Sequence, residues 1–236
     1  MKQIFITGSS RGLGLGFTRQ FLEKGETVIA SCRDPKKAKD LQELQAKYPD
    51  NLSIIQLDVT KEDERNRAYE HAKQNFEVLD LLINNAGIIS GDEEKIYNLG
   101  EVYKEDFSKV LLVNSISPLL MSEKFLPLLE QGTKAKIINI SSLNGCITRR
   151  TERGKYSYCT SKAALNMITK ILSNDLREKE ITVLAIHPGW VLTDMGGPDA
   201  PLEKEETISM LINLIETIEI SDTGKFLDWQ GNALPW

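Results

Sequence analysis

Short apolar runs, mostly of β-branched residues, alternate along the chain with longer amphipathic stretches. This alternation is typical of βα units arranged around a parallel sheet. Strands are predicted at residues 3–7, 27–32, 53–58, 79–84, 136–141, 182–187 and 226–229. Helices are predicted at residues 13–24, 35–48, 61–76, 102–130, 156–177 and 203–218. The pattern predicts an α/β fold with a doubly wound, mostly parallel seven-stranded sheet and helices on both faces, formed by one domain over residues 1–236.

Charge and composition exclude several classes of protein. The 29 basic and 34 acidic residues give a formal net charge of −5, so no global positive field attracts nucleic acid or anionic lipid. No apolar run approaches the roughly 18 to 20 residues that span a bilayer, and the first strand breaks to Gly8 before a signal sequence can form. We therefore predict a cytoplasmic location. The three cysteines lack a CxxC pair and the two histidines lie far apart, so neither a disulfide framework nor a metal site is predicted.

A glycine-rich turn follows the first predicted strand and opens the first predicted helix. Glycine there lets the backbone turn tightly and approach a pyrophosphate, which the helix N-terminal N–H groups then bind. The alternative is a plain glycine-rich turn, but the flanking strand and helix supply the context that a dinucleotide site requires. The predicted cofactor-binding residues of this turn are Gly8, Ser10, Arg11, Gly12, Leu13 and Gly14.

The end of the second predicted strand indicates which dinucleotide binds. Asp34 lies at the distance from the glycines expected of a ribose-binding carboxylate, but Pro35 follows it, so Asp34 also fits the N-cap of the next helix. The cap interpretation is favoured, which leaves Arg11 and Arg33 to face the ribose. Guanidinium groups suit a phosphate better than a diol, so we predict NADP(H) over the alternative of two surface arginines.

Asp58 and Val59 end the third predicted strand, where Asp58 is predicted to accept a hydrogen bond from the adenine amino group. The alternative for Asp58 is a cap of the helix that starts near Lys61.

Tyr158 and Lys162 lie one helical turn apart and therefore on one face of a predicted helix. Such a pair alone is usually a solvated helix face. Other features support a catalytic role: Ser141 and Ser142 end the fifth strand, and Asn114 lies within an apolar helix, where a polar side chain needs a reason. A further polar segment, Asn84-Asn85-Ala86-Gly87, ends the fourth strand.

With the glycine turn, these residues resemble the short-chain dehydrogenase/reductase superfamily along essentially the entire chain. The resemblance is closest to sniffer-type carbonyl reductases and bacterial C-factor proteins. It is carried by Arg11-Gly12-Leu13-Gly14-Leu15-Gly16, His187-Pro188-Gly189-Trp190-Val191, Thr193-Asp194-Met195-Gly196-Gly197 and Pro235-Trp236. It implies a Rossmann-type domain and a catalytic tetrad of Asn114, Ser142, Tyr158 and Lys162. Many relatives have a shorter spacing between serine and tyrosine, so Ser141 is the alternative to Ser142.

The resemblance also implies further cofactor contacts and roles. The cofactor residues are Asn85, Ala86, Gly87, Tyr158, Lys162, Pro188, Gly189, Trp190, Val191 and Thr193. The segment 188–193 is expected over the nicotinamide, where Thr193 bonds the carboxamide or instead caps a short helix. Trp190 and Met195 offer apolar surface to a substrate or simply pack. In many relatives the helices near Val102 and Tyr156 form a dimer surface, so a homodimer is an expectation.

Carbonyl reduction needs a proton donor at oxygen while hydride reaches carbon. Tyr158 is the predicted donor, Lys162 is expected to favour its tyrosinate, and Ser142 to hydrogen-bond the developing alkoxide. Asn114 is expected to hold a water that relays protons to Lys162, unless it is a satisfied helix asparagine.

The predicted function is NADPH-dependent reduction of a small-molecule aldehyde or ketone, with no metal. The alternatives are an alcohol or hydroxysteroid dehydrogenase acting oxidatively and a non-catalytic NADP(H)-binding signalling protein of C-factor type. The cluster of Arg149, Arg150 and Arg153 between the serine and the tyrosine is interpreted as solvated, with recognition of an anionic substrate as the alternative.

Overall fold

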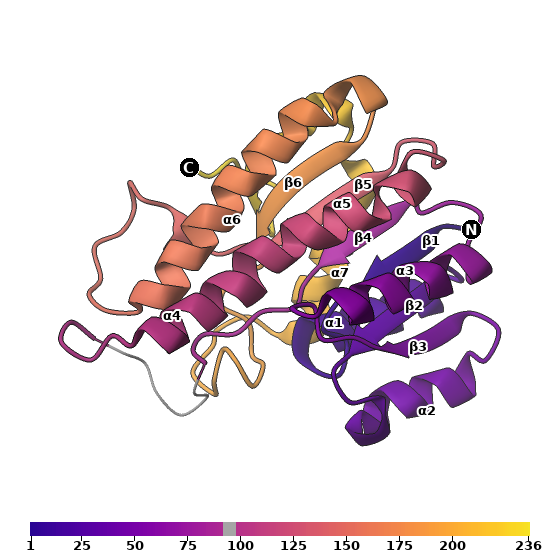
Figure 1. The fold of residues 1–236 in the computed structure, drawn as a ribbon, viewed down its shortest axis with the longest axis horizontal. Coiled ribbons are helices and arrows are strands. Elements are labelled where there is room, and N and C mark those ends of the chain that lie inside the picture. Colours follow the sequence, from indigo (N-terminus) through magenta and orange to yellow (C-terminus); the bar gives the residue numbers. More distant parts are fainter. Residues whose placement is uncertain (92–97) are drawn as a thin grey trace.

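A computed structural model describes residues 1–91 and 98–236 of the chain. Its sheet has seven strands in the order β3-β2-β1-β4-β5-β6-β7, and each neighbouring pair is parallel (Figure 1). The strands are β1 (Gln3–Ile6), β2 (Thr27–Cys32), β3 (Leu52–Gln56), β4 (Leu81–Asn84), β5 (Lys136–Ile140), β6 (Thr182–His187) and β7 (Phe226–Asp228). The α-helices are α1 (Gly12–Glu23), α2 (Lys39–Lys47), α3 (Glu62–Asn75), α4 (Lys104–Leu111), α5 (Ser117–Leu129), α6 (Tyr156–Asp175) and α7 (Lys204–Thr217). The predicted doubly wound α/β fold is confirmed.

Alternation along β1 divides the core into two layers. Ile4 and Ile6 pack with apolar residues of α1, α2 and α7 on one face of the sheet. Phe5 points to the other face, where it packs with residues of α3 and α5. This two-residue period is what a sheet covered on both faces requires. In α7, Ile208, Leu211, Ile212 and Ile215 form one apolar stripe, and all four are buried in the core.

Parallel pairing brings the carboxyl ends of all the strands to one edge of the sheet. The glycine turn after β1, the segment 85–91 after β4, the serine turn 142–146 after β5 and the loop 188–203 after β6 therefore start from the same edge. The predicted strand 79–84 and helix 102–130 leave a long loop at residues 86–101, and residues 92–97 of that loop lie outside the described residues. Within the described residues, no helix is both long and apolar enough to cross a membrane.

The predicted helix 35–48 is split in two. A 3-10 turn, η1 (Pro35–Lys37), precedes α2, and Ala38 between them has a non-helical conformation. Asp34 does occupy the N-cap position with Pro35 after it, but its carboxylate caps no backbone N–H of the described residues and lies 3.4 Å from Lys37 Nζ. The side-chain cap predicted for Asp34 is therefore wrong. The Lys37 ammonium competes with the backbone N–H groups for the exposed Asp34 carboxylate, and the cap interpretation did not consider this ion pair.

The predicted helix 102–130 contains a π-helical turn, η2 (Leu112–Ile116), between α4 and α5. The backbone remains right-handed helical on both sides of it. Asn114 lies inside this turn and is fully buried. Single π turns within α-helices occur frequently at functional sites, so the π turn makes Asn114 a candidate site residue.

Candidate active site

The glycine turn packs so closely on itself and on the segment after β4 that larger residues would not fit. A Cβ placed on Gly14 would lie 2.3 Å from the Gly8 carbonyl oxygen, and one on Gly8 would lie 2.9 Å from Ala86 Cα. Gly8 and Gly12 also have φ values of +71° and +58°, which favour glycine. Within the described residues the N-cap of α1, Arg11, makes no side-chain cap hydrogen bond, so its side chain does not take up the helix N-terminal N–H groups. A close backbone turn leading into a helix N-terminus fits a pyrophosphate.

The segment after β4 is tied to this turn. The Thr7 hydroxyl accepts hydrogen bonds from the backbone N–H groups of Asn85 and Ala86, each at 3.0 Å. The Asn85 side chain donates to the carbonyl oxygens of Thr7 at 2.9 Å and Gly8 at 3.0 Å. The structure thus gives Asn85 a bracing role behind the turn.

The loop after β6 folds over the glycine turn. A Cβ on Gly12 would lie 3.8 Å from the Thr193 side chain, and Arg11 lies 3.3 Å from the Asp194 carboxylate in an exposed ion pair. The Thr193 hydroxyl accepts from the Gly196 N–H at 3.1 Å, so Thr193 braces a turn, and no helix follows it within the described part of the loop. The helix cap that was the alternative for Thr193 is therefore wrong, and the carboxamide contact stays a prediction.

Other residues of this loop are held closely. Gly189 has φ +87°, and a Cβ there would lie 2.3 Å from Leu202 Cδ1. Val191 is buried and bridges to Leu202, and Pro188 is buried beside them. Trp190 is about half exposed, but its indole N–H donates to the Gly196 carbonyl at 2.7 Å. The loop therefore has a fixed path over the glycine turn, with the Trp190 ring on its surface.

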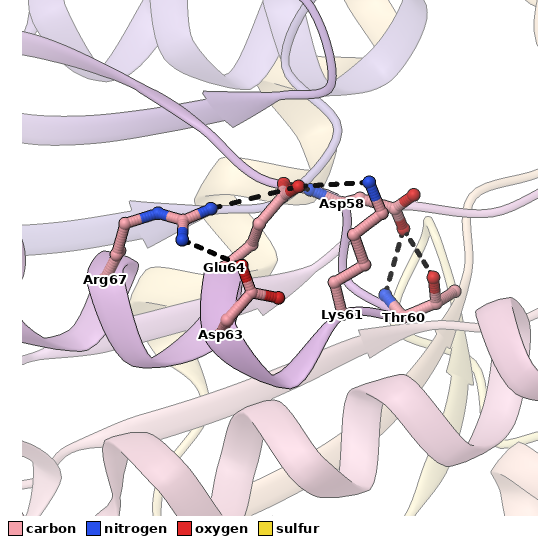
Figure 2. A network of polar contacts seen from close by, with 6 residues as sticks. All are labelled: Asp58, Thr60, Lys61, Asp63, Glu64 and Arg67. Carbon is pink, nitrogen blue, oxygen red and sulfur yellow. Dashed lines mark hydrogen bonds and ion pairs between the residues drawn. The ribbon is translucent and has the colours of Figure 1, made fainter.

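Asp58 lies in a polar network at the start of α3, which Figure 2 shows from close by. Its Oδ1 accepts from the Thr60 N–H at 3.0 Å and the Thr60 hydroxyl at 2.7 Å, while its own N–H donates to Glu64 at 2.6 Å. The N-cap of α3 is Lys61, so Asp58 is not the helix cap that was its alternative role. The network fixes the Asp58 carboxylate at the end of β3, next to the buried Val59. An adenine contact by Asp58 stays a prediction.

Ser142 and Tyr158 meet across the carboxyl edge of β5. The Ser142 hydroxyl lies close enough to the Tyr158 phenol to lower its pKa, although sixteen positions separate the two residues in the sequence. Ser141 instead donates to Asn166 Oδ1 at 2.5 Å, in the buried layer between β5 and α6. The structure therefore brings Ser142, and not its alternative Ser141, to the tyrosine.

Lys162 is buried beside this pair. Its Nζ lies 5.8 Å from the centroid of the Tyr158 ring and donates to the Ile140 carbonyl at 2.8 Å. Burial lowers the pKa of Lys162 from 10.5 to about 8. A Cβ on Gly87 would lie 3.7 Å from the Lys162 Nζ and 3.4 Å from Asn114 Oδ1, so the segment after β4 borders both side chains.

The pKa of Tyr158 differs from the sequence expectation. Burial raises it above its usual value of 10, and the Ser142 hydroxyl lowers it only in part. Lys162 was expected to favour the tyrosinate. In the chain itself burial is the largest influence on the Tyr158 pKa, Lys162 is not among the groups that lower it, and the Lys162 ammonium donates to the Ile140 carbonyl.

The Asn114 side chain closes a ring of hydrogen bonds. Its Oδ1 accepts from the Ile88 N–H at 2.8 Å, and its Nδ2 donates to the Ile88 carbonyl at 2.7 Å and to Ser161 Oγ at 3.0 Å. These contacts support the alternative of a satisfied asparagine that holds the segment after β4 to the π turn. A water relay at Asn114 stays a prediction.

Two features of the site went unnoticed in the sequence. A Cβ on Gly145 would lie 2.6 Å from the backbone carbonyl carbon of Lys162, so the serine turn touches α6 backbone to backbone. Arg150, expected to be solvated, keeps only 22% of its side chain exposed and donates to Asn144. The position of Gly145, three residues after Ser142, was a sequence signal for the close contact with α6. The sequence contained no signal for the burial of Arg150.

Comparisons with known proteins agree with this geometry. The profile of the family described as short chain dehydrogenase matches residues 2–203. The chain therefore belongs to the short-chain dehydrogenase family, and its sheet is the Rossmann-type sheet that the resemblance implied.

Among its relatives, C-signal of Myxococcus xanthus is 38% identical over 158 residues, which are 67% of this chain and 93% of C-signal. The structure of the carbonyl reductase Sniffer of D. melanogaster covers 100% of both chains with a TM-score of 0.95 and 33% identity. An NADPH-bound carbonyl reductase from chicken fatty liver has a TM-score of 0.93 and 37% identity, and the match covers 100% of this chain and 99% of that one.

Proposed function

We propose that this chain reduces a carbonyl group of a small molecule to an alcohol, with NADPH as the cofactor. The observation that carries the proposal is the placement of Tyr158 between the Ser142 hydroxyl, which lowers the pKa of the phenol in part, and the buried Lys162, whose Nζ lies 5.8 Å from the Tyr158 ring centroid. Two similar proteins are described as carbonyl reductases, and one of them binds NADPH. These similarities support the substrate class and the cofactor.

The residues present fit the cofactor. The backbone of the glycine turn and the N-terminus of α1 would hold the pyrophosphate. Arg11 and Arg33, both exposed at the carboxyl edge of the sheet, would bind the 2′-phosphate, for which Arg11 would exchange its contact with Asp194. NADPH supplies hydride to the carbonyl carbon when it is bound.

Tyr158 is the proton donor of the proposed reaction. Its raised pKa keeps the phenol protonated at neutral pH, and a carbonyl oxygen that becomes an alkoxide is basic enough to take that proton. Ser142 holds the same oxygen through its hydroxyl. The lysine ammonium, protonated below pH about 8, lies close enough to stabilise the tyrosinate that remains. The same groups serve both directions, so the ratio of the cofactors decides between reduction and the oxidative alternative.

The proposal is tested by following NADPH absorbance with a panel of aldehydes, ketones and quinones. We expect turnover of at least one of these carbonyl classes, with NADPH preferred over NADH. Tight binding of NADPH without turnover of any panel member would favour the non-catalytic signalling alternative and contradict the proposed reaction.

A further inference from the structure

The segment between Ser142 and Tyr158 must hold two reacting hydroxyls together across a long loop. Residues 146–155 form neither α-helix nor strand, and several of them are exposed. The ends of such a loop separate readily unless specific contacts fix them. Arg150, near the middle of the loop, makes such contacts, and 22% of its side chain is exposed.

The Arg150 guanidinium bonds to both ends of the loop at once. Its Nη1 donates to Asn144 Oδ1 at 2.8 Å, in the serine turn. Its Nη2 donates to the carbonyl oxygens of Arg153 at 3.2 Å and Gly154 at 3.1 Å, directly before α6. Nη1 also lies 3.3 Å from the carboxylate of the exposed Glu152. The planar guanidinium carries several N–H donors, and this lets one side chain bond to Asn144 and to both carbonyls at the same time.

On the serine side the contact leads to the hydroxyl itself. The Asn144 N–H donates to Ser142 Oγ at 3.1 Å, so a shift of Asn144 moves the group that lies next to Tyr158. Asn144 therefore connects the Arg150 guanidinium to the Ser142 hydroxyl.

On the tyrosine side the contact fixes the start of α6. Lys155, the N-cap, has φ +54°, a left-handed conformation that is unfavourable for a non-glycine residue. Its carbonyl accepts the Cys159 N–H at 2.9 Å, in the first turn of the helix that carries Tyr158. Arg150 bonds the two carbonyls just before Lys155 and so supports this turn.

We propose that Arg150 is a positioning residue that joins the serine turn to the start of α6 and so keeps Ser142 next to Tyr158. The inference rests on the proposed function, because it assigns these two hydroxyls to the reaction. Recognition of an anionic substrate by Arg150 is disfavoured, since protein oxygens already engage both terminal nitrogens of the guanidinium.

The test compares Arg150→Gln and Arg150→Lys with Arg149→Gln, which removes the same charge from the exposed neighbouring position. We expect Arg150→Gln to lower kcat by roughly 10- to 100-fold, because displacement of reacting groups by about 1 Å costs up to that factor. NADPH affinity and cooperative thermal unfolding should stay close to wild type. Arg150→Lys should remain impaired, because one ammonium cannot bond to Asn144 and both carbonyls. Arg149→Gln should match wild type.

Coupling to Asn144 separates positioning from general destabilisation. If Arg150 acts through the serine turn, Asn144→Ala and Arg150→Gln should not be additive in kcat, and the double variant should resemble Arg150→Gln alone. Additive losses, or full activity in Arg150→Lys, would overturn the inference. Tyr158→Phe serves as the reference: if it is inactive while Arg150→Gln turns over normally, the positioning role fails and the proposed function stands. If Tyr158→Phe is fully active, both fail.

A second readout does not depend on turnover. Burial raises the pKa of the Cys159 thiol, and Arg150 and Lys155 lower it in part, while Glu152 raises it. Cys159 is half-buried, whereas Cys32 and Cys146 are buried. Arg150→Gln should therefore slow alkylation of Cys159 by iodoacetamide at pH 8, and Arg150→Lys should restore much of the rate. An unchanged rate in Arg150→Gln would show that the guanidinium does not lie at the start of α6.

Discussion

The close backbone contact between the serine turn and α6 can be tested with one methyl group. A Cβ on Gly145 would lie 2.6 Å from the carbonyl carbon of Lys162, 2.8 Å from its oxygen and 2.9 Å from the Ala163 nitrogen. Ordinary contacts begin near 3.4 Å, so Gly145→Ala must move the serine turn away from α6 by about 0.8 Å. Gly145 does not have a positive φ, so the substitution adds a steric conflict without a conformational penalty.

Two magnitudes follow from this displacement. Overpacking of this kind lowers the free energy of unfolding by about 1–3 kcal/mol. A separation of roughly 1 Å between Ser142 and Tyr158 lowers kcat by about 10- to 100-fold. We expect both losses, with little change in NADPH affinity, because the glycine turn follows a different strand.

The matched control is Gly132→Ala. A Cβ on Gly132 would lie 2.9 Å from the Leu79 carbonyl oxygen, at the opposite edge of the sheet from the site. Urea denaturation and steady-state kinetics of both variants decide the question. Gly132→Ala should lose stability and keep kcat. If Gly145→Ala loses stability but keeps the wild-type kcat, the contact with α6 does not position the serine.

Three further predictions address charge and the cofactor. Lys162 has a pKa of about 8 in the fold against 10.5 ordinarily, so the unfolded chain binds more protons between these values and the free energy of unfolding rises with pH there. Lys162→Met should therefore raise the free energy of unfolding more at pH 7.5 than at pH 10. The gain at pH 7.5 should be about 3 kcal/mol before the lost hydrogen bond to Ile140 is subtracted. Equal gains in urea titrations at both pH values would contradict this. In the reductive reaction kcat/KM should fall above pH about 8, and Lys162→Arg should move that fall to higher pH, which a pH series of initial rates measures. Arg33→Ala should raise the KM for NADPH and leave that for NADH nearly unchanged; equal changes for both cofactors would refute the phosphate assignment.

The fold could be predicted because its signals are local. The period of two in β1 and the buried stripe of α7 each appear within a few consecutive residues. The glycine turn was recognisable for the same reason, since its strand, turn and helix are contiguous. Ser142, Tyr158 and Lys162 were identified by resemblance, and the fold brings them together.

The misjudged features depend on contacts between distant segments. Arg150 was expected in solvent because its partners, Asn144 and the carbonyl of Gly154, are brought to it only by the path of the loop. Asn114 could not be matched to Ile88 in advance, because the segment after β4 reaches the π turn only in the folded chain. The pKa of Tyr158 was misjudged for a similar reason: its burial depends on the packing of several elements, whereas its spacing from Lys162 is written in the sequence.

The central claim is that the Tyr158 hydroxyl gives its proton to the substrate oxygen. Tyr158→Phe removes that hydroxyl and keeps the ring, so NADPH binding followed by fluorescence should match wild type. Turnover of a carbonyl substrate should fall by roughly three orders of magnitude, which combines lost acid catalysis with lost stabilisation of the oxyanion. A variant that binds NADPH and reduces the carbonyl at the wild-type rate would contradict the claim.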